Sequence, residues 1–180
     1  IKKDILVVRA GIKTGLDIRI DNPSQLGSDL VVDAVAGIEA YQAPLLIFDL
    51  GTATTVSVVD KQYIYRGTMI YPGIMVSLDS LTAHAAQLGG ISLEAPNHMI
   101  GKNTVESMKS GIIFSSAAAI DGIIDRLEEE LGEPATVVAT GGLAKKIIPH
   151  CKRNIIVDEN LLLKGLAIIY QKNRHKNSKE

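Results

Sequence analysis

The residues best suited to chemistry lie in the segment Asp49-Leu-Gly-Thr-Ala-Thr-Thr55. Gly51 lets the backbone approach a phosphate closely, while the hydroxyls of Thr52, Thr54 and Thr55 and the N–H groups of the turn can donate hydrogen bonds to phosphate oxygens. The carboxylate of Asp49 can hold a cation beside that phosphate. The segment is therefore a candidate site for polyphosphate and metal. A threonine-rich β-hairpin is the alternative, because threonine is also a good strand former.

Two further features could take part in chemistry. Gly141-Gly142 follows an apolar run and precedes a helical pattern, a position where a nucleotide can lie against bare backbone, although an ordinary tight turn has the same sequence. Asp29 stands at the expected start of a helix, after Gly27 and Ser28, where the helix dipole favours its ionised form. An acid that only stabilises the helix is the alternative there.

Composition excludes several other classes of function. The 19 basic and 20 acidic residues nearly balance, so no broad attraction to nucleic acid or to a membrane surface is expected. No apolar run approaches the length of a membrane span. The four histidines lack metal-ligand spacing, and no nucleophilic triad is indicated. The single cysteine, Cys151, excludes an internal disulfide and fits a reducing cytoplasm.

The elements that must position these residues alternate between strand and helix. This alternation, with a hairpin around Gly51, predicts an α/β fold whose sheet is mixed. Strands are expected at 5–8, 45–48, 56–59, 63–70, 136–139 and 155–157, and helices at 29–41, 74–88, 104–131, 143–148 and 161–170. The charged tail from Lys172 is expected to fray.

The longest expected helix begins with the pattern of a capping box. Asn103 offers a side-chain acceptor and Glu106 a carboxylate three residues later, and Gly132 with Pro134 marks the end of the helix. Helical spacing of the apolar residues predicts which side faces the core. The predicted inner face consists of Met108, Ile112, Ala119, Ile123 and Leu127.

Taken in order along the chain, these segments resemble the type III pantothenate kinases of bacteria. The resemblance implies an actin-like, ribonuclease H-like ATPase lobe with a mixed sheet and flanking helices, from the superfold of acetate kinase, sugar kinases, Hsp70 and actin. It implies transfer of the ATP γ-phosphoryl group to the primary hydroxyl of pantothenate. The matching stretches are 11–16, 21–23, 27–29, 49–55, 72–73, 101–104, 110–111, 139–142 and 163–166.

The resemblance also implies roles for particular residues. Asp29 would accept or orient the proton of the pantothenate hydroxyl, and Asp49 would bind a monovalent cation, potassium or ammonium. The loop of Gly27, Ser28, Asp29 and Leu30, with Thr104, would hold pantothenate. Gly51, Thr52 and Thr54 would contact ATP, used with Mg²⁺, and Gly141 and Gly142 would lie near the adenosine. A homodimer is implied, with the helix from Thr104 as candidate partner face; an ordinary core helix is the alternative.

Three departures from the family pattern lie on the pantothenate side. Leu30 stands where arginine is usual, Ile20 where tyrosine is frequent, and Asp33 where asparagine is usual. They raise two alternatives. One is a kinase of the same fold that phosphorylates another small hydroxyl compound, and the other is a non-catalytic regulatory protein.

The resemblance predicts a division of the chain near residue 44. Residues 1–44 would be a remnant of an N-terminal lobe together with the acceptor-site helix, and residues 45–180 the C-terminal actin-like lobe. The chain begins with Ile1 rather than Met, and the Asp-x-Gly-Asn-Thr phosphate loop with which the family begins has no match here. We therefore expect the first lobe to be largely missing and this chain alone to be inactive.

Overall fold

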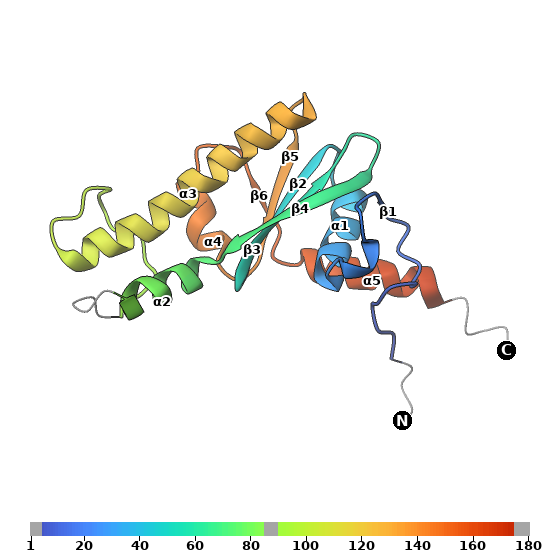
Figure 1. Ribbon diagram of the computed structural model, residues 1–180, viewed down its shortest axis with the longest axis horizontal. Helices are drawn as coiled ribbons and strands as arrows, with labels where there is room; N and C mark the ends of the chain where they lie inside the picture. Colours follow the sequence, from blue (N-terminus) through green and yellow to red (C-terminus); the bar gives the residue numbers. More distant parts are fainter. Residues whose placement is uncertain (1–4, 85–89, 175–180) are drawn as a thin grey trace.

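A computed structural model describes residues 5–84 and 90–174, in which helices cover both faces of a mixed six-stranded sheet (Figure 1). This arrangement confirms the mixed α/β fold. The strands are β1 (Asp17–Ile18), β2 (Leu45–Leu50), β3 (Ala53–Val59), β4 (Ile64–Pro72), β5 (Thr136–Thr140) and β6 (Ile156–Val157). The helices are α1 (Ser28–Ala40), α2 (Ile74–His84), α3 (Thr104–Leu131), α4 (Ala144–Ile147) and α5 (Leu161–Arg174), with 3-10 turns η1 (Pro23–Gln25) and η2 (Ile148–His150).

The sheet has the order β1-β4-β3-β2-β5-β6. Strands β2, β3 and β4 form an antiparallel meander, whereas β5 is parallel to β2, β6 to β5 and β1 to β4. Because β2 and β5 run parallel, their carboxyl ends meet at one edge of the sheet. The two glycine turns predicted to carry chemistry follow those ends.

The central strand β2 is buried on both faces, as its continuous apolar run predicts. Leu45 and Ile47 pack with residues of α1 and α5 on one face. Leu46, Phe48 and Leu50 point to the opposite face and pack with residues of α2, α3 and α4. The alternation of side chains along this strand therefore divides the core into two layers.

Helices α1 and α5 cross at very short range on the first face. A Cβ atom at Gly165 of α5 would lie 2.1 Å from the carbonyl oxygen of Val32 in α1. A Cβ atom at Gly37 would lie 2.6 Å from a methyl carbon of Ile47. Because glycine stands at these positions, α1 packs closely against both α5 and β2. This packing fixes the position of the loop that precedes α1.

Helix α3 begins at the predicted capping box and ends as predicted at Gly132. The side chain of Asn103 accepts a hydrogen bond from the N–H of Glu106 at 2.9 Å, whereas the Glu106 carboxylate accepts from the N–H of Lys102, one residue before the partner that the box predicts. The predicted inner face is partly wrong: Ala119 is exposed, and Ile112, Ile123 and Leu127 lie at the margin of the core. The buried line of α3 consists of Met108, Ser110, Ile113, Ala117, Ile120 and Ile124.

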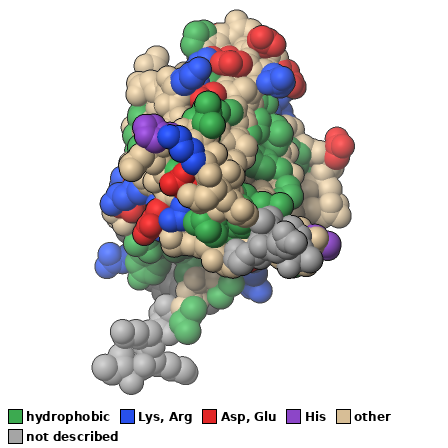
Figure 2. All heavy atoms as spheres, turned by 90° about the vertical axis from the view of Figure 1, so that its left-hand side faces the viewer, with side chains coloured by type: hydrophobic (Ala, Val, Ile, Leu, Met, Phe, Trp, Pro, Cys, Tyr) green, Lys and Arg blue, Asp and Glu red, His purple; other side chains and the backbone are tan. Residues whose placement is uncertain are grey.

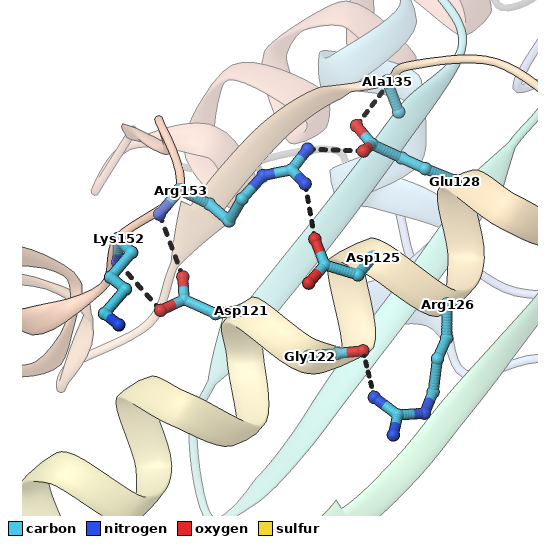
Figure 3. A network of polar contacts seen from close by, with 8 residues as sticks. All are labelled: Asp121, Gly122, Asp125, Arg126, Glu128, Ala135, Lys152 and Arg153. Atoms are coloured by element: carbon cyan, nitrogen blue, oxygen red, sulfur yellow. Dashed lines mark hydrogen bonds and ion pairs between the residues drawn. The ribbon is translucent and has the colours of Figure 1, made fainter.

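A polar network joins α3 to the loop before β6 (Figure 3). Asp121 accepts hydrogen bonds from the backbone N–H groups of Lys152 and Arg153 at 2.8 and 3.0 Å. The Arg153 guanidinium contacts Asp125 and Glu128, and Glu128 also accepts from the N–H of Ala135. These contacts attach α3 to the connections at both ends of β5 and so stiffen the layer behind the glycine turn.

Several predicted element boundaries differ from the observed ones. Residues 5–8 form no strand, because no strand lies beside them in the described part of the chain to accept their hydrogen bonds. Helix α5 extends to Arg174, past the residue where fraying was expected, and the rest of that tail lies outside the described residues. The predicted continuation of α2 through 85–88 also lies outside them. None of the helices described is long and apolar enough to cross a membrane.

Candidate active site

The two glycine turns lie against each other at the carboxyl ends of β2 and β5. Asp49 pairs with Thr140 in the parallel register, and a Cβ atom at Gly141 would lie 2.3 Å from Oδ1 of Asp49. Gly141 has a φ of +90°, and its Cβ would also lie 2.7 Å from backbone atoms of Leu50. Only glycine fits at position 141, and its absent side chain leaves the Asp49 carboxylate beside bare backbone.

A third glycine completes this cluster of turns. A Cβ atom at Gly73 would lie 2.1 Å from the carbonyl oxygen of Thr52 and 2.6 Å from that of Gly51. The antiparallel register of β3 and β4, which pairs Ala53 with Pro72, brings the end of β4 to this point. Gly73 therefore fixes the turn that the sequence predicts to hold phosphate.

The two acids singled out in the sequence influence the same site. Burial raises the pKa of Asp49, and the negative charge of Asp29 raises it further. Asp29 is exposed at the amino end of α1, and its Oδ1 accepts a hydrogen bond from the N–H of Leu30 at 2.9 Å. The fold thus combines a carboxylate from the first turn of α1 with one from the carboxyl end of β2, 20 residues later in the sequence.

An open groove of about 770 Å³ contains Asp29. The loop before α1, the first residues of β3 and the middle of β4 form its walls. Gly27 and the buried side chain of Leu30 line it from α1, and Thr55 and Thr68 supply hydroxyl groups from the sheet. Its volume lies in the range of small-molecule sites, roughly 300–1,000 Å³.

The structure places the predicted contact residues in three different settings. Ser28, Thr52 and Gly142 are exposed near the glycine turns and the start of α1, where a ligand can reach them. Thr54 is 1% exposed, so its side chain is buried in the described part of the chain, and the ATP contact expected of its hydroxyl stays a prediction. Thr104 begins α3 at the end of the molecule opposite to α1, and it does not line the groove of Asp29 (Figure 1).

Sequence reasoning missed two residues at this site. The contact of Gly73 with the phosphate turn follows from the pairing of β3 with β4, whereas the sequence shows residues 72–73 only as a stretch that matches the family. Arg66 lines the groove from β4. In the sequence, Arg66 is a charged residue that precedes a glycine within a strand pattern. Such a pattern indicates an irregular strand. Without the fold, it does not indicate a functional position.

The residues around Asp49 suit a cation that keeps some ligands from outside the protein. Across residues 5–84 and 90–174, no three histidine, cysteine or acidic side chains come together as a metal site. Asp33 nevertheless carries a buried carboxylate oxygen with no hydrogen-bond partner. A cation bound by Asp49 would take its other ligands from backbone carbonyls, water or phosphate oxygens, which potassium and magnesium accept.

Asp33 lies one helical turn after Asp29 and is 3% exposed. Its pKa rises from 3.8 to about 7 because burial and the negative charges of Asp49, Asp29 and Asp158 disfavour its ionised form. The folded protein therefore holds a proton on Asp33 at pH values where the unfolded chain has lost it. Ionisation of Asp33 destabilises the fold progressively as the pH rises from about 4 to about 7.

We predict that Asp33→Asn stabilises the protein, and does so more at pH 8 than at pH 5. Asparagine keeps the shape of the neutral acid and cannot ionise. Since one pKa unit corresponds to ~1.4 kcal/mol, the gain in unfolding free energy should grow by on the order of 2 kcal/mol between these pH values. Denaturant unfolding at both pH values measures it, with the exposed Asp79→Asn in α2 as control. A pH-independent difference would contradict the buried acid.

Two solved structures resemble this fold. A conserved protein assigned to the Baf family of transcriptional activators, from Campylobacter jejuni, is 20% identical with a TM-score of 0.56, over 89% of this chain and 69% of that one. The activator of 2-hydroxyisocaproyl-CoA dehydratase from Clostridium difficile, with bound ADPNP, is 15% identical with a TM-score of 0.51, over 90% and 73% of the two chains. These likenesses confirm the actin-like fold class.

The sequence comparisons identify the family. The model of the type III pantothenate kinase family matches residues 1–126. The type III pantothenate kinase of an Exiguobacterium species is 48% identical over 94% of this chain, and that of Bacillus cytotoxicus is 46% identical over 93%. The chain spans 66% and 64% of the lengths of these two relatives. The chain thus belongs to the type III pantothenate kinase family.

Proposed function

We propose that this chain carries the catalytic centre of a kinase that transfers the γ-phosphoryl group of ATP to the primary hydroxyl of pantothenate. The product would be 4′-phosphopantothenate, the first intermediate of coenzyme A synthesis. One observation carries the proposal beyond family membership. Asp29 lines an open groove together with Ala53 and Thr55, which follow the phosphate turn, and its negative charge raises the pKa of Asp49 at the junction of the glycine turns. An acceptor site and a phosphate site therefore adjoin.

In this mechanism Asp29 accepts or orients the proton of the pantothenate hydroxyl. It is exposed and held at a helix start by the N–H of Leu30, so its oxygens can reach a substrate without unfolding any element. Phosphoryl transfer depends mainly on positioning and on neutralising charge, and a well-placed carboxylate with cations can suffice. Gly27 and Leu30 line the groove beside Asp29 and form the wall against which the acceptor lies, and the exposed Ser28 stands between Gly27 and Asp29 in the sequence.

The glycine turns would hold the nucleotide. The bare backbone of Gly51, Gly141 and Gly142 allows close approach, and the exposed Thr52 can donate a hydroxyl hydrogen bond to a phosphate oxygen. Asp49 would bind the monovalent cation, potassium or ammonium, and Mg²⁺ would accompany ATP. Such cations neutralise phosphate charge and also relieve the repulsion between Asp49 and Asp29.

We further propose that the protein acts as a homodimer. Thr104 is the first residue of α3 and does not line the groove of its own chain, so it could contact pantothenate only from a second copy. Apolar side chains are exposed on α2 and at the start of α3, among them Val76, Leu81 and Val105. Figure 2 views the molecule from that end, and hydrophobic side chains cover part of the surface. As a kinase of small metabolites, the protein would work in the cytoplasm.

The test is ADP release by the full-length protein with ATP, Mg²⁺ and K⁺, in the presence and absence of pantothenate. We expect release that depends on pantothenate and saturates with it. Release that appears only with a different hydroxyl compound would replace pantothenate by that acceptor. A folded, nucleotide-binding dimer that releases no ADP with any acceptor would favour the regulatory alternative.

A further inference from the structure

The groove that contains Asp29 has a distinct charge pattern. Leu30, which stands at the usual arginine of the family pattern, is 7% exposed and gives the groove an apolar wall instead of a cation. Two arginines, Arg19 and Arg66, nevertheless line the same groove. They come from the loop after β1 and from β4. The positive charge that Leu30 does not supply is thus present elsewhere in the same groove.

An irregularity in the sheet places Arg66 between two hollows, because it lines the groove of Asp29 and also a hollow beside α3 that contains its ion-pair partner Asp60. Val58 pairs with Gly67 and Val59 pairs with Tyr65, so Arg66 is an additional residue in β4, and Gly67 has a φ of +154°. Such a bulge redirects the side chain of the extra residue, and bulges are frequent next to functional sites. Without it, the strict alternation of a strand would assign Arg66 to one face of the sheet.

Arg19 lies beside Arg66 because β1 runs parallel to β4. Ile18 pairs with Tyr65, and the N–H of Arg19 donates to the carbonyl oxygen of Tyr65 at 3.0 Å. The side chain of Arg19 contacts Asp17 at 3.0 Å, and that of Arg66 contacts Asp60 at 3.2 Å. A guanidinium has five N–H donors, so a single carboxylate contact leaves donors available on each arginine.

We propose that Arg66, with Arg19 beside it, binds the carboxylate of the acceptor while Asp29 contacts the acceptor's hydroxyl. The inference rests on the proposed function and assigns the group that recognises the far end of pantothenate, which carries a carboxylate. A planar guanidinium binds a carboxylate through two parallel hydrogen bonds, which gives direction as well as strength. The groove would then align the acceptor between a cation at one end and an acid at the other.

The test compares two acceptors in steady-state kinetics of the full-length protein. Pantothenate carries the carboxylate, whereas its primary amide is neutral and keeps the same hydroxyl. For Arg66→Gln we expect KM for pantothenate to rise about 10- to 100-fold, the range for a lost hydrogen bond to a charged group, while kcat changes little. KM for the amide and KM for ATP should stay within a few-fold of the unchanged protein.

Two further variants separate binding from structure. Arg66→Lys keeps the charge but not the paired geometry, so it should recover part of the affinity for pantothenate. Arg126→Gln, in α3, removes an exposed arginine that donates only to the Gly122 carbonyl of its own helix, and it should leave both acceptors unaffected. Retained melting temperature of all variants shows that the fold is intact.

Other outcomes would overturn the inference. An equal rise in KM for pantothenate and for the amide would show that Arg66 supports the structure of the groove without binding the carboxylate. A rise confined to KM for ATP would assign Arg66 to a phosphate. Absence of turnover with pantothenate in the unchanged protein would reject the proposed function itself, and this is seen before any substitution is made.

Discussion

Replacing Asp29 by asparagine should reduce kcat for pantothenate about 10²- to 10⁴-fold, the usual contribution of a general base. Asparagine has nearly the same shape but cannot take the proton of the acceptor hydroxyl. Because Asp29 is exposed and contributes one short-range hydrogen bond, the fold should survive the change. Steady-state ADP release, measured together with the melting temperature, gives the comparison.

Glu129→Gln in α3 is the matched control for Asp29→Asn. Glu129 is exposed and distant from the groove in the sequence and in the fold, so the loss of its charge should leave kcat unchanged. Nearly full activity of Asp29→Asn, with an unaltered melting temperature, would remove Asp29 from its proposed role. The acid at the helix start would then be a helix stabiliser only.

Gly141→Ala should destabilise the protein and weaken nucleotide binding at the same time. A φ of +90° costs a residue with a Cβ roughly 1–2 kcal/mol, and here the Cβ would also lie 2.3 Å from the Asp49 carboxylate. Relief requires a shift of the turn or of Asp49, both at the site of phosphate. We expect a loss of at least about 3 kcal/mol in unfolding free energy and a KM for ATP at least about 10-fold higher.

The neighbouring glycine provides a control for this effect. A Cβ atom at Gly142 would have no atom within 4 Å, and Gly142 lacks a positive φ, so Gly142→Ala should leave the unfolding free energy within about 0.5 kcal/mol. Denaturant unfolding of both variants measures the difference. Equal stabilities would show that the junction of the two turns is looser than the contacts indicate.

The sequence predicted the parts of the site whose chemistry is local. A glycine-threonine turn after a buried strand, a glycine pair after another and an acid at a helix start each have a recognisable pattern. The place where these three segments come together depends on contacts between residues that are far apart in the sequence. Asp49 lies beside Gly141 because β2 and β5 are parallel neighbours, and the order of strands in a sheet cannot be read from the periodicity of either strand.

The burial of Thr54 was not predicted, for a related reason. The strand was expected to begin at Val56, which would leave Thr54 in the turn, whereas β3 begins at Ala53. Alternation then places Thr54 on the same buried side as Val56. An error of three residues in the strand boundary therefore assigned a buried residue to an exposed turn.

The inner face of α3 was misplaced because the helix is apolar on adjacent sides. Neighbouring pairs such as Ile112 with Ile113 and Ile123 with Ile124 fit two parallel lines equally well. Packing against the sheet selects the line through Ile113 and Ile124, and the other line lies at the margin. The apolar pattern of a helix alone does not show which of its sides packs against the sheet.

The most direct test of the account is identification of the product. The full-length protein is incubated with pantothenate, Mg²⁺, K⁺ and ATP labelled at the γ-phosphate, and the products are separated and analysed by mass spectrometry. The account predicts that the label moves to the primary hydroxyl of pantothenate, giving 4′-phosphopantothenate. Label found only in ATP and inorganic phosphate, with pantothenate unchanged, would contradict it.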